Sequence, residues 1–306
     1  MITREHCDAC GGVLVDCFAM GDMPLANALL TAEQLHEPTA TYPLTVTECR
    51  DCSLVQLRHV VAPEVLYAGY RFFSGASSPN SAYFDGLAKW ISARSQGNRV
   101  LEIGSNDGTL LAALERQNFD VTGIDPATAQ CEQARQRLHR GRVKCQFWGS
   151  AAADEYHDWR FDVVVACNVL GHSNDLTDFV SSVKRVLNPN GLFVIEVQYL
   201  KSLLRESAFE NVYHEHQFVF DEISLSALLR RHGFCIHGWE TTDAQCGTLR
   251  LWAGLSGKNV IPEAIKHDWG SFRRGVRNRV HGLNNAVRYL KQDRRRVILS
   301  GSPATA

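Results

Sequence analysis

The sequence predicts an α/β fold in which a doubly wound parallel sheet follows a small metal-binding module. Two C-x-x-C pairs stand near the start of the chain, and from Val100 onward short apolar strands alternate with helices of apolar periodicity. Strands separated by helices form a parallel sheet that is covered on both faces. The 306 residues carry a formal net charge of −1, which allows two or three modules and gives no overall attraction to nucleic acid.

The N-terminal stretch "MITREHCDACGG" contains no apolar core of a signal peptide. No apolar run approaches the ~18 residues that would span a membrane. We therefore expect a cytoplasmic protein that makes no membrane contact. In such a chain, C-x-x-C pairs indicate metal ligands rather than disulfides.

The first module, residues 1–65, has the cysteine spacing of a zinc ribbon. Each C-x-x-C pair directs two thiolates to one ion, and four thiolates complete a closed tetrahedral shell. Because such a shell leaves no position for substrate water, the predicted zinc is structural. Its ligands are Cys7, Cys10, Cys49 and Cys52. The remaining cysteines are scattered and are expected to be small core residues: Cys17, Cys131, Cys145, Cys167, Cys235 and Cys246.

The stretch "VLEIGSNDGTLLAAL" reads as a strand, a loop of small and polar residues, and a helix. A dinucleotide fingerprint requires glycine at three places, but after Gly104 the second place is Asn106 and the third is Thr109. NAD is therefore disfavoured. Glu102 followed by Gly104 and Gly108 fits instead the first motif of S-adenosylmethionine (SAM) methyltransferases, which predicts a class I SAM-methyltransferase sheet over residues 96–256.

The next strand, "FDVTGID", ends in Asp125, whose carboxylate is placed to bind the ribose hydroxyls. Phe147 and Trp148 end the third strand, where stacking on adenine and packing in the core are both consistent with the sequence. The predicted cofactor-binding residues are Glu102, Gly104, Asn106, Asp107, Gly108, Asp125, Pro126, Phe147 and Asn168.

Two polar groups follow later strands, at the edge of the sheet where ligands of open α/β folds bind. The fourth strand ends in "NVLGHSND", which brings His172 to this edge, and "YHEH" at residues 213–216 follows the fifth strand. A metal site at "YHEH" is disfavoured because adjacent residues of an extended chain point to opposite faces. An acid/base centre and a polar turn without chemistry both remain open, and His172 is either a site residue or a structural one.

A series of motifs, in order over about residues 5 to 300, resembles the zinc-containing sugar C-methyltransferases of deoxysugar biosynthesis. They are "CDAC", "PLAN", "CRDCSLVQL", "YRFFSGASS", "LEIGSNDGTLL", "GIDP", "NVLGHSNDLTDFV", "VIEVQYL", "VYHEHQFVF" and "GTLRLW". The resemblance implies an enzyme, found in antibiotic and other natural-product pathways, that transfers methyl from SAM. Its substrate would be a dTDP-linked 4-keto-6-deoxysugar, methylated at carbon 3 through an enolate.

The resemblance also implies the active-site roles. His216 is the general base, since an imidazole titrates near neutrality, and Tyr213 donates to the carbon-4 oxygen, although the two could exchange roles. Glu215 and His172 would orient the other groups or hold the sugar. The zinc module would cover the sugar nucleotide as a lid. Residues 66–95 would connect the modules and either line the cleft or pack between domains through Tyr67, Tyr70, Phe73 and Ser74.

The last segment, residues 257–306, departs from that family, whose members usually continue for another hundred or so residues. It predicts an amphipathic helix with Phe272, Val276, Val280 and Leu283 in its apolar stripe, followed by the start of a shortened domain. Its many basic residues form a solvated face or a phosphate contact, and self-association through the stripe is plausible. The family's "HGG" reads Gln245, Cys246 and Gly247 here, which affects sugar recognition.

Two other functions are consistent with parts of the sequence. A zinc ribbon before a SAM domain also occurs in RNA methyltransferases, but the near-zero charge and the lack of basic residues around the cysteine pairs disfavour nucleic acid. A shortened homologue that binds SAM without catalysis is the third possibility. Intact "YHEH" argues for chemistry, and we take the sugar C-methyltransferase as the leading hypothesis.

Overall fold

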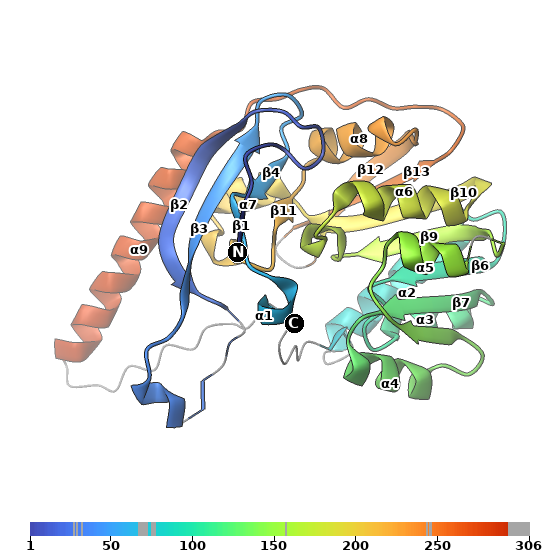
Figure 1. Ribbon diagram of the computed structural model, residues 1–306, viewed down its shortest axis with the longest axis horizontal. Coiled ribbons are helices and arrows are strands. Elements are labelled where there is room, and N and C mark those ends of the chain that lie inside the picture. Colours follow the sequence, from blue (N-terminus) through green and yellow to red (C-terminus); the bar gives the residue numbers. More distant parts are fainter. Residues whose placement is uncertain are drawn as a thin grey trace.

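The computed structural model describes residues 1–292 apart from residues 27, 29, 32, 67–72, 75–77, 157, 243, 245 and 246. It contains two main sheets that lie side by side (Figure 1). The predicted residues Tyr67, Tyr70, Gln245 and Cys246, and the start of a further domain after residue 292, lie outside the described residues. None of the described helices is long and apolar enough to cross a membrane.

The larger sheet has seven strands and includes the predicted methyltransferase strands. Its order is β12 (Cys235–Thr242), β13 (Thr248–Gly254), β10 (Leu187–Gln198), β9 (Phe161–Cys167), β6 (Arg99–Ile103), β7 (Asp120–Asp125) and β8 (Arg142–Cys145). The five strands from β10 to β8 pair in parallel, but β13 is antiparallel to both β10 and β12. The predicted doubly wound sheet is thus present, but this edge differs from the expected parallel order because β12 and β13 pair as an antiparallel hairpin.

Helices cover both faces of this sheet, as predicted. Residues of β9 alternate between the two sides: Val163 and Val165 share one core cluster, whereas Val164 and Ala166 belong to the other. The first cluster includes residues of α2 (Ser78–Ser92) and α3 (Thr109–Arg116). The second includes residues of α5 (Ser150–Glu155), α6 (Leu176–Val186) and α8 (Glu222–Arg231). The helix α4 (Thr128–Arg137) packs at the β7–β8 end of the sheet.

The smaller sheet is antiparallel and carries the zinc-ribbon cysteines. Its order is β11 (Phe218–Val219), β4 (Val55–Leu57), β3 (Thr41–Cys49) and β2 (Leu14–Pro24). The remaining short elements nearby are β1 (Ile2–Thr3), which pairs with β5 (His59–Val60), the 3-10 helix η1 (Glu33–His36) and α1 (Pro63–Leu66). The edge strand β11 of the smaller sheet comes from the chain between β10 and β12 of the larger sheet. The methyltransferase segment therefore contributes one strand to the smaller sheet, which links the two modules.

A charged junction also joins the two sheets. His267 donates from Nδ1 to Glu48 Oε1 of β3 at 2.8 Å and from Nε2 to Asp221 Oδ2, before α8, at 3.0 Å. Because a carboxylate only accepts hydrogen bonds, both ring nitrogens carry protons. Burial alone would lower the pKa of His267, but the two carboxylates raise it to about 9. The imidazolium thus bridges both modules at neutral pH.

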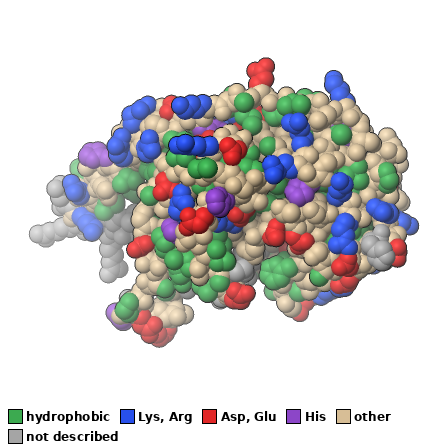
Figure 2. Space-filling view, turned by 45° about the horizontal axis from the view of Figure 1, so that its top comes forward, with side chains coloured by type: hydrophobic (Ala, Val, Ile, Leu, Met, Phe, Trp, Pro, Cys, Tyr) green, Lys and Arg blue, Asp and Glu red, His purple; other side chains and the backbone are tan. Residues whose placement is uncertain are grey.

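The predicted amphipathic helix is α9 (Trp269–Gln292), which lies along the outer side of β2 (Figure 1). Phe272 is fully buried and its ring packs edge-on against Phe18, with 5.1 Å between centroids. Further along the same stripe, Val280 and Leu283 are exposed. The apolar stripe is therefore covered only in its first half. On the molecular face drawn in Figure 2, Lys and Arg side chains are scattered among Asp and Glu and do not form a single basic patch.

Candidate active site and metal centre

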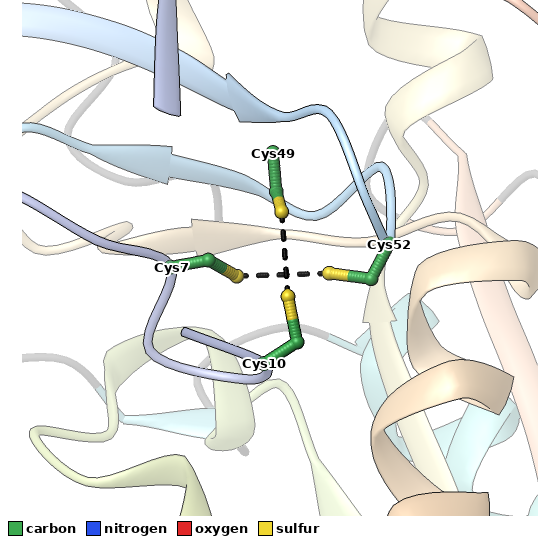
Figure 3. A group of neighbouring side chains, drawn as sticks. All are labelled: Cys7, Cys10, Cys49 and Cys52. Carbon is green, nitrogen blue, oxygen red and sulfur yellow. Dashed lines mark hydrogen bonds between the residues drawn. The ribbon is translucent and has the colours of Figure 1, made fainter. Parts of the chain in front are cut away.

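The four predicted zinc ligands converge on one point (Figure 3). Their Sγ atoms lie within 4.8 Å of one another, with 3.6 Å between Cys7 and Cys52 and 3.4 Å between Cys10 and Cys49. An ion about 2.3 Å from each sulfur in a tetrahedron would separate the sulfurs by roughly 3.8 Å. The cluster therefore fits zinc, and no other such group of metal-binding side chains occurs in the described part of the chain.

Backbone geometry explains why the two C-x-x-C pairs form this cluster. Each pair turns back through a residue with positive φ, Gly11 after the first pair and Ser53 after the second. Amide groups point at the sulfurs: the Gly12 N–H donates to Cys10 Sγ and the Asp51 N–H to Cys49 Sγ, both at 3.4 Å. A Cβ on Gly12 would lie 2.9 Å from Cys49 Sγ, so only glycine fits there. The four cysteine sulfurs would occupy all four coordination positions of the ion, as in a structural zinc site.

The predicted cofactor loop follows β6 and turns tightly over the end of the sheet. Gly104 and Gly108 have φ values of 71° and 74°, a region that favours glycine. The Gly104 N–H donates to the Ile124 carbonyl at 2.8 Å, which holds the loop against β7. A Cβ on Gly104 would meet Val169 at 2.9 Å, so this loop also touches the segment that leads to His172.

Glu102 is the most unusual group beneath this loop. It is 4% exposed, and its Oε2 has no hydrogen-bond partner among the described residues. Burial, together with the nearby charges of Asp125 and Asp107, raises the pKa of Glu102 well above its usual range. A buried carboxyl of this kind is stabilised by a cationic ligand, and SAM carries both a sulfonium and an ammonium group. The residues present therefore fit SAM.

The other acids of the loop are held by hydrogen bonds. Asp125 accepts from the Asn106 N–H at Oδ2 and from the Ala127 N–H at Oδ1, both at 2.9 Å, and thus ties the loop to the start of α4. Asp107 is buried and accepts from the Thr109 hydroxyl at 2.7 Å. The Asn106 side chain also accepts from the Ser74 N–H, which brings the predicted connecting segment against the loop.

Three further predicted cofactor residues lie around the same end of the sheet. Pro126 follows β7, and its carbonyl accepts from the Cys145 thiol at 3.5 Å. Phe147 follows β8 and is 64% exposed, which leaves its ring free of the core, whereas Trp148 packs against Phe179 and donates to its carbonyl. Asn168 directly follows β9 and has a φ of 53°. Whether Phe147 or Asn168 binds a cofactor stays a prediction.

The "YHEH" segment forms a turn that brings two of its four side chains, Tyr213 and His216, together. The His216 N–H donates to the Tyr213 carbonyl at 3.0 Å, and this turn brings the Tyr213 hydroxyl within 2.9 Å of His216 Nε2. His216 Nδ1 lies 2.9 Å from the Asn211 carbonyl, which only accepts, so Nδ1 carries the proton. In the neutral ring, Nε2 must then accept from Tyr213. The backbone therefore forms a turn, and the choice between an acid/base centre and a polar turn without chemistry stays open.

His172 completes this group from the segment that follows β9. It ends η3 (Leu170–His172), and its ring centroid lies 5.0 Å from that of His216 in an edge-on arrangement. Burial lowers the pKa of His216 to about 4, against a hydrogen bond to Asn211. Burial and the neighbouring His216 ring lower the pKa of His172 to about 3, against a hydrogen bond to the Glu215 backbone. Both imidazoles are therefore neutral at pH 7.

His214 and Glu215 take other directions. His214 is buried and donates from Nε2 to the Tyr42 carbonyl of β3 at 3.2 Å, while its ring lies edge-on to that of Tyr42. It therefore anchors the turn to the smaller sheet. Glu215 is also buried, and its backbone bonds His172. Asn211, in η4 (Phe209–Asn211), could not be predicted from the sequence, because it contributes a backbone carbonyl, which every residue type has.

Two family models match the chain. One, described as "Methyltransferase domain", covers residues 76–237, which is more than half of the sequence. The chain belongs to this methyltransferase family. The other, described as "Putative zinc binding domain", covers residues 7–67 and includes all four clustered cysteines.

Individual relatives agree with this family. The C-methyltransferase NovU of Streptomyces niveus is 30% identical over 271 residues, which cover 86% of this methyltransferase and 62% of NovU. A ubiquinone biosynthesis O-methyltransferase of Azorhizobium caulinodans is 32% identical over 102 residues, or 33% of this chain and 40% of that protein. The chain thus spans less than two thirds of the length of either relative.

The fold is confirmed by a solved structure. The PH0226 protein of Pyrococcus horikoshii OT3 superposes with a TM-score of 0.51 at 17% identity, covering 63% of this chain and 99% of that one. At this identity the likeness concerns the fold alone. Together with the methyltransferase match, the strand order and the four-cysteine cluster, it confirms the predicted class I α/β sheet with an N-terminal metal-binding module.

Proposed function

We propose that this methyltransferase transfers a methyl group from SAM to a carbon atom next to a ketone. The hydrogen-bonded pair of Tyr213 and His216 carries the proposal. A carbon next to a ketone becomes a nucleophile only after it loses a proton, and His216 offers an unprotonated Nε2 to receive it. The similarity to a C-methyltransferase supports the same reaction class.

The cofactor would lie at the loop after β6. Glu102 would face its cationic part, the glycines Gly104 and Gly108 would allow close approach of the backbone, and Asp125 would bind the ribose hydroxyls. When bound, SAM supplies the methyl group that the substrate carbon takes, and its sulfur keeps the electron pair of the broken bond. Phe147 would supply an exposed ring for the adenine.

The chain's own residues would manage the proton and the charge. His216 Nε2 accepts the proton from the substrate carbon, and the electron pair of that C–H bond moves into the enolate. The Tyr213 hydroxyl, which bonds Nε2 in the absence of substrate, turns to the enolate oxygen and stabilises its charge. The Nδ1–H bond to Asn211 keeps the ring oriented and stabilises the imidazolium that forms.

His172 and Glu215 would hold the rest of the site. Burial keeps the His172 imidazole neutral, so it adds no positive charge that would oppose protonation of His216. Both residues would orient the other groups of the site or hold the sugar. The zinc would be structural and hold the smaller sheet beside the turn.

The substrate that we propose is a dTDP-linked 4-keto-6-deoxysugar, methylated at carbon 3. The ketone at carbon 4 acidifies the neighbouring proton, which suits a histidine base. The motif resemblance favours this substrate class, and the C-methyltransferase relative supports transfer to carbon. A sugar of this kind would place the reaction in deoxysugar biosynthesis.

The test is transfer of isotope-labelled methyl from SAM to a panel of dTDP-4-keto-6-deoxysugars. The wild-type chain is compared with His216→Ala and with His281→Ala, whose ring is exposed on α9 and hydrogen-bonds to Asn285. We expect labelled sugar from the wild type and from His281→Ala, and none from His216→Ala. Equal transfer by His216→Ala would refute the assigned base. A wild type that binds SAM but methylates no sugar would refute the substrate class.

A further inference from the structure

Gln217, the residue after His216, joins the two segments that carry the candidate catalytic histidines. Gln217 is fully buried, and both the oxygen and the nitrogen of its side-chain amide form hydrogen bonds. Arg4 donates from one guanidinium nitrogen to Gln217 Oε1 at 2.9 Å, and Gln217 Nε2 donates to Asn174 Oδ1 at 2.9 Å. Asn174 stands two residues after His172. One amide therefore links the His216 turn to the His172 segment.

Arg4 is itself held by the metal-binding module. Its Nε pairs with Asp8 Oδ2 at 2.6 Å, and Asp8 stands between the first two clustered cysteines. The guanidinium also donates to the Leu57 carbonyl of β4 at 3.3 Å and lies 4.5 Å from the ring centre of Phe218 in β11. Since Arg4 is buried and fully engaged, its position is set by the smaller sheet.

Backbone contacts bring the same two segments together. The Leu57 N–H donates to the Gln217 carbonyl at 2.9 Å, which places Gln217 at the edge of the sheet beside β11. On the other side, a Cβ on Gly171 would lie 3.0 Å from the Phe218 carbonyl oxygen. The residue before His172 therefore packs directly on the backbone of β11, with no room between them for an ordinary side chain.

We propose that Arg4, Gln217 and Asn174 form a positioning clamp that sets the distance between the His172 and His216 rings. None of the three is a catalytic residue, because they act through the segments that carry the histidines. The clamp connects the metal-binding module to the acid/base pair, so that module helps to position the site. The effect of the clamp on rate rests on the proposed function, whereas its effect on the two rings does not.

The most direct test removes the exposed end of the clamp. Asn174 is on the surface, so Asn174→Ala should fold, and Asn174→Asp keeps an oxygen that can accept from Gln217. Asn188→Ala is the matched control. Asn188 lies at the start of β10, away from the site, and its side-chain amide donates a hydrogen bond to Asp162 of β9. Gln217→Ala removes the centre of the clamp and is compared after its zinc content and melting temperature have been measured.

Two readouts separate the clamp from the reaction. Imidazole NMR signals of His172 and His216 report the ring positions without turnover, with the exposed His281 as internal reference. We expect both signals to move in Asn174→Ala and Gln217→Ala and to stay in Asn188→Ala. In methyl transfer, we expect Asn174→Ala to lower kcat roughly tenfold, with KM for SAM unchanged and recovery in Asn174→Asp, because small misplacement of reacting groups is costly.

The possible outcomes test the clamp, its effect on the reaction rate and the proposed function separately. Unchanged His172 and His216 signals in both clamp variants overturn the clamp, whatever the activity. Moved signals with an unchanged kcat overturn its role in positioning for the reaction. Moved signals in a protein whose wild type methylates no sugar support the clamp as a structural device and refute the proposed function instead.

Discussion

The two sheets of this methyltransferase are assembled by different routes. In the larger sheet, the parallel strands alternate with the helices that cover them, and apolar residues on both faces form its core. The smaller sheet carries the four clustered cysteines, shares its apolar core with residues of α9, and takes its edge strand β11 from a distant part of the chain. The comparison teaches that the cofactor loop depends on local structure, whereas the acid/base turn depends on contacts between modules.

Loss of the metal should have the largest effect and should separate the two regions. Cys49→Ser removes one of four ligands, so we expect no bound zinc and at least about a hundredfold loss of methyl transfer, because a structural zinc contributes folding free energy. SAM binding, which depends on the larger sheet, should change less than about threefold. Metal analysis and calorimetric titration with SAM measure both. Cys235→Ser, at a half-buried cysteine outside the cluster, is the control, and a loss of SAM binding in Cys49→Ser alone would break the proposed division.

Removal of the base should come next and should leave both sheets folded. His216→Ala should lower kcat by about 10² to 10⁴, the usual contribution of a general base. Tyr213→Phe keeps the ring but loses the hydroxyl that bonds Nε2, and a smaller loss of about 10² is expected. Steady-state kinetics with labelled SAM measure both. A larger loss in Tyr213→Phe than in His216→Ala would exchange their assigned roles.

The pH dependence of the reaction should reflect how deeply the turn is buried. The base acts only when it is neutral, and burial lowers the pKa of His216 to about 4. Activity in kcat/KM should therefore persist below pH 6.5 and fall only as the pH drops through about 4. A pH–rate profile corrected for reversible unfolding measures this limb. A limb at the ordinary histidine value near 6.5 would place the base in an open, hydrated site.

The His267 junction should have a moderate effect on stability. Its pKa is raised to about 9, so its contribution is fully present below about pH 6.5 and is lost as the pH rises through about 9. His267→Ala also leaves Asp221 and Glu48 without their shared partner and should cost about 3 kcal/mol of unfolding free energy at pH 7. Denaturant unfolding at pH 7 and pH 9.5 measures both effects. Wild-type stability that does not decrease between these values would contradict the charged junction.

The smallest effect is expected on the outer half of α9. Leu283→Ser changes an exposed side chain and should alter the unfolding free energy by less than about 0.5 kcal/mol. Phe272→Ala, in the covered half, is the contrasting variant and should cost about 3 to 5 kcal/mol because it leaves a cavity against β2. Thermal melts compare the two. Equal losses would show that the outer half is covered in solution.

The sequence predicted best what is local. Cysteine spacing found all four members of the metal cluster, and apolar periodicity found the strands and helices around Glu102 and Gly104. The antiparallel β13 was missed because the direction of a strand depends on its connection and not on its composition. The roles of Gln217 and Asn211 were also beyond reach, since one depends on a partner near the N-terminus and the other on a backbone carbonyl.

The position of β11 in the chain has a consequence for how the protein is made. During synthesis from the N-terminus, β2, β3 and β4 leave the ribosome together with all four cysteines, so zinc can bind early. The partner of β4, however, is β11, which is translated only after most of the larger sheet. Until then the edge of β4 is an unpaired strand, open to wrong partners. Completion of the smaller sheet thus comes late in translation, and the acid/base turn is assembled at the same moment.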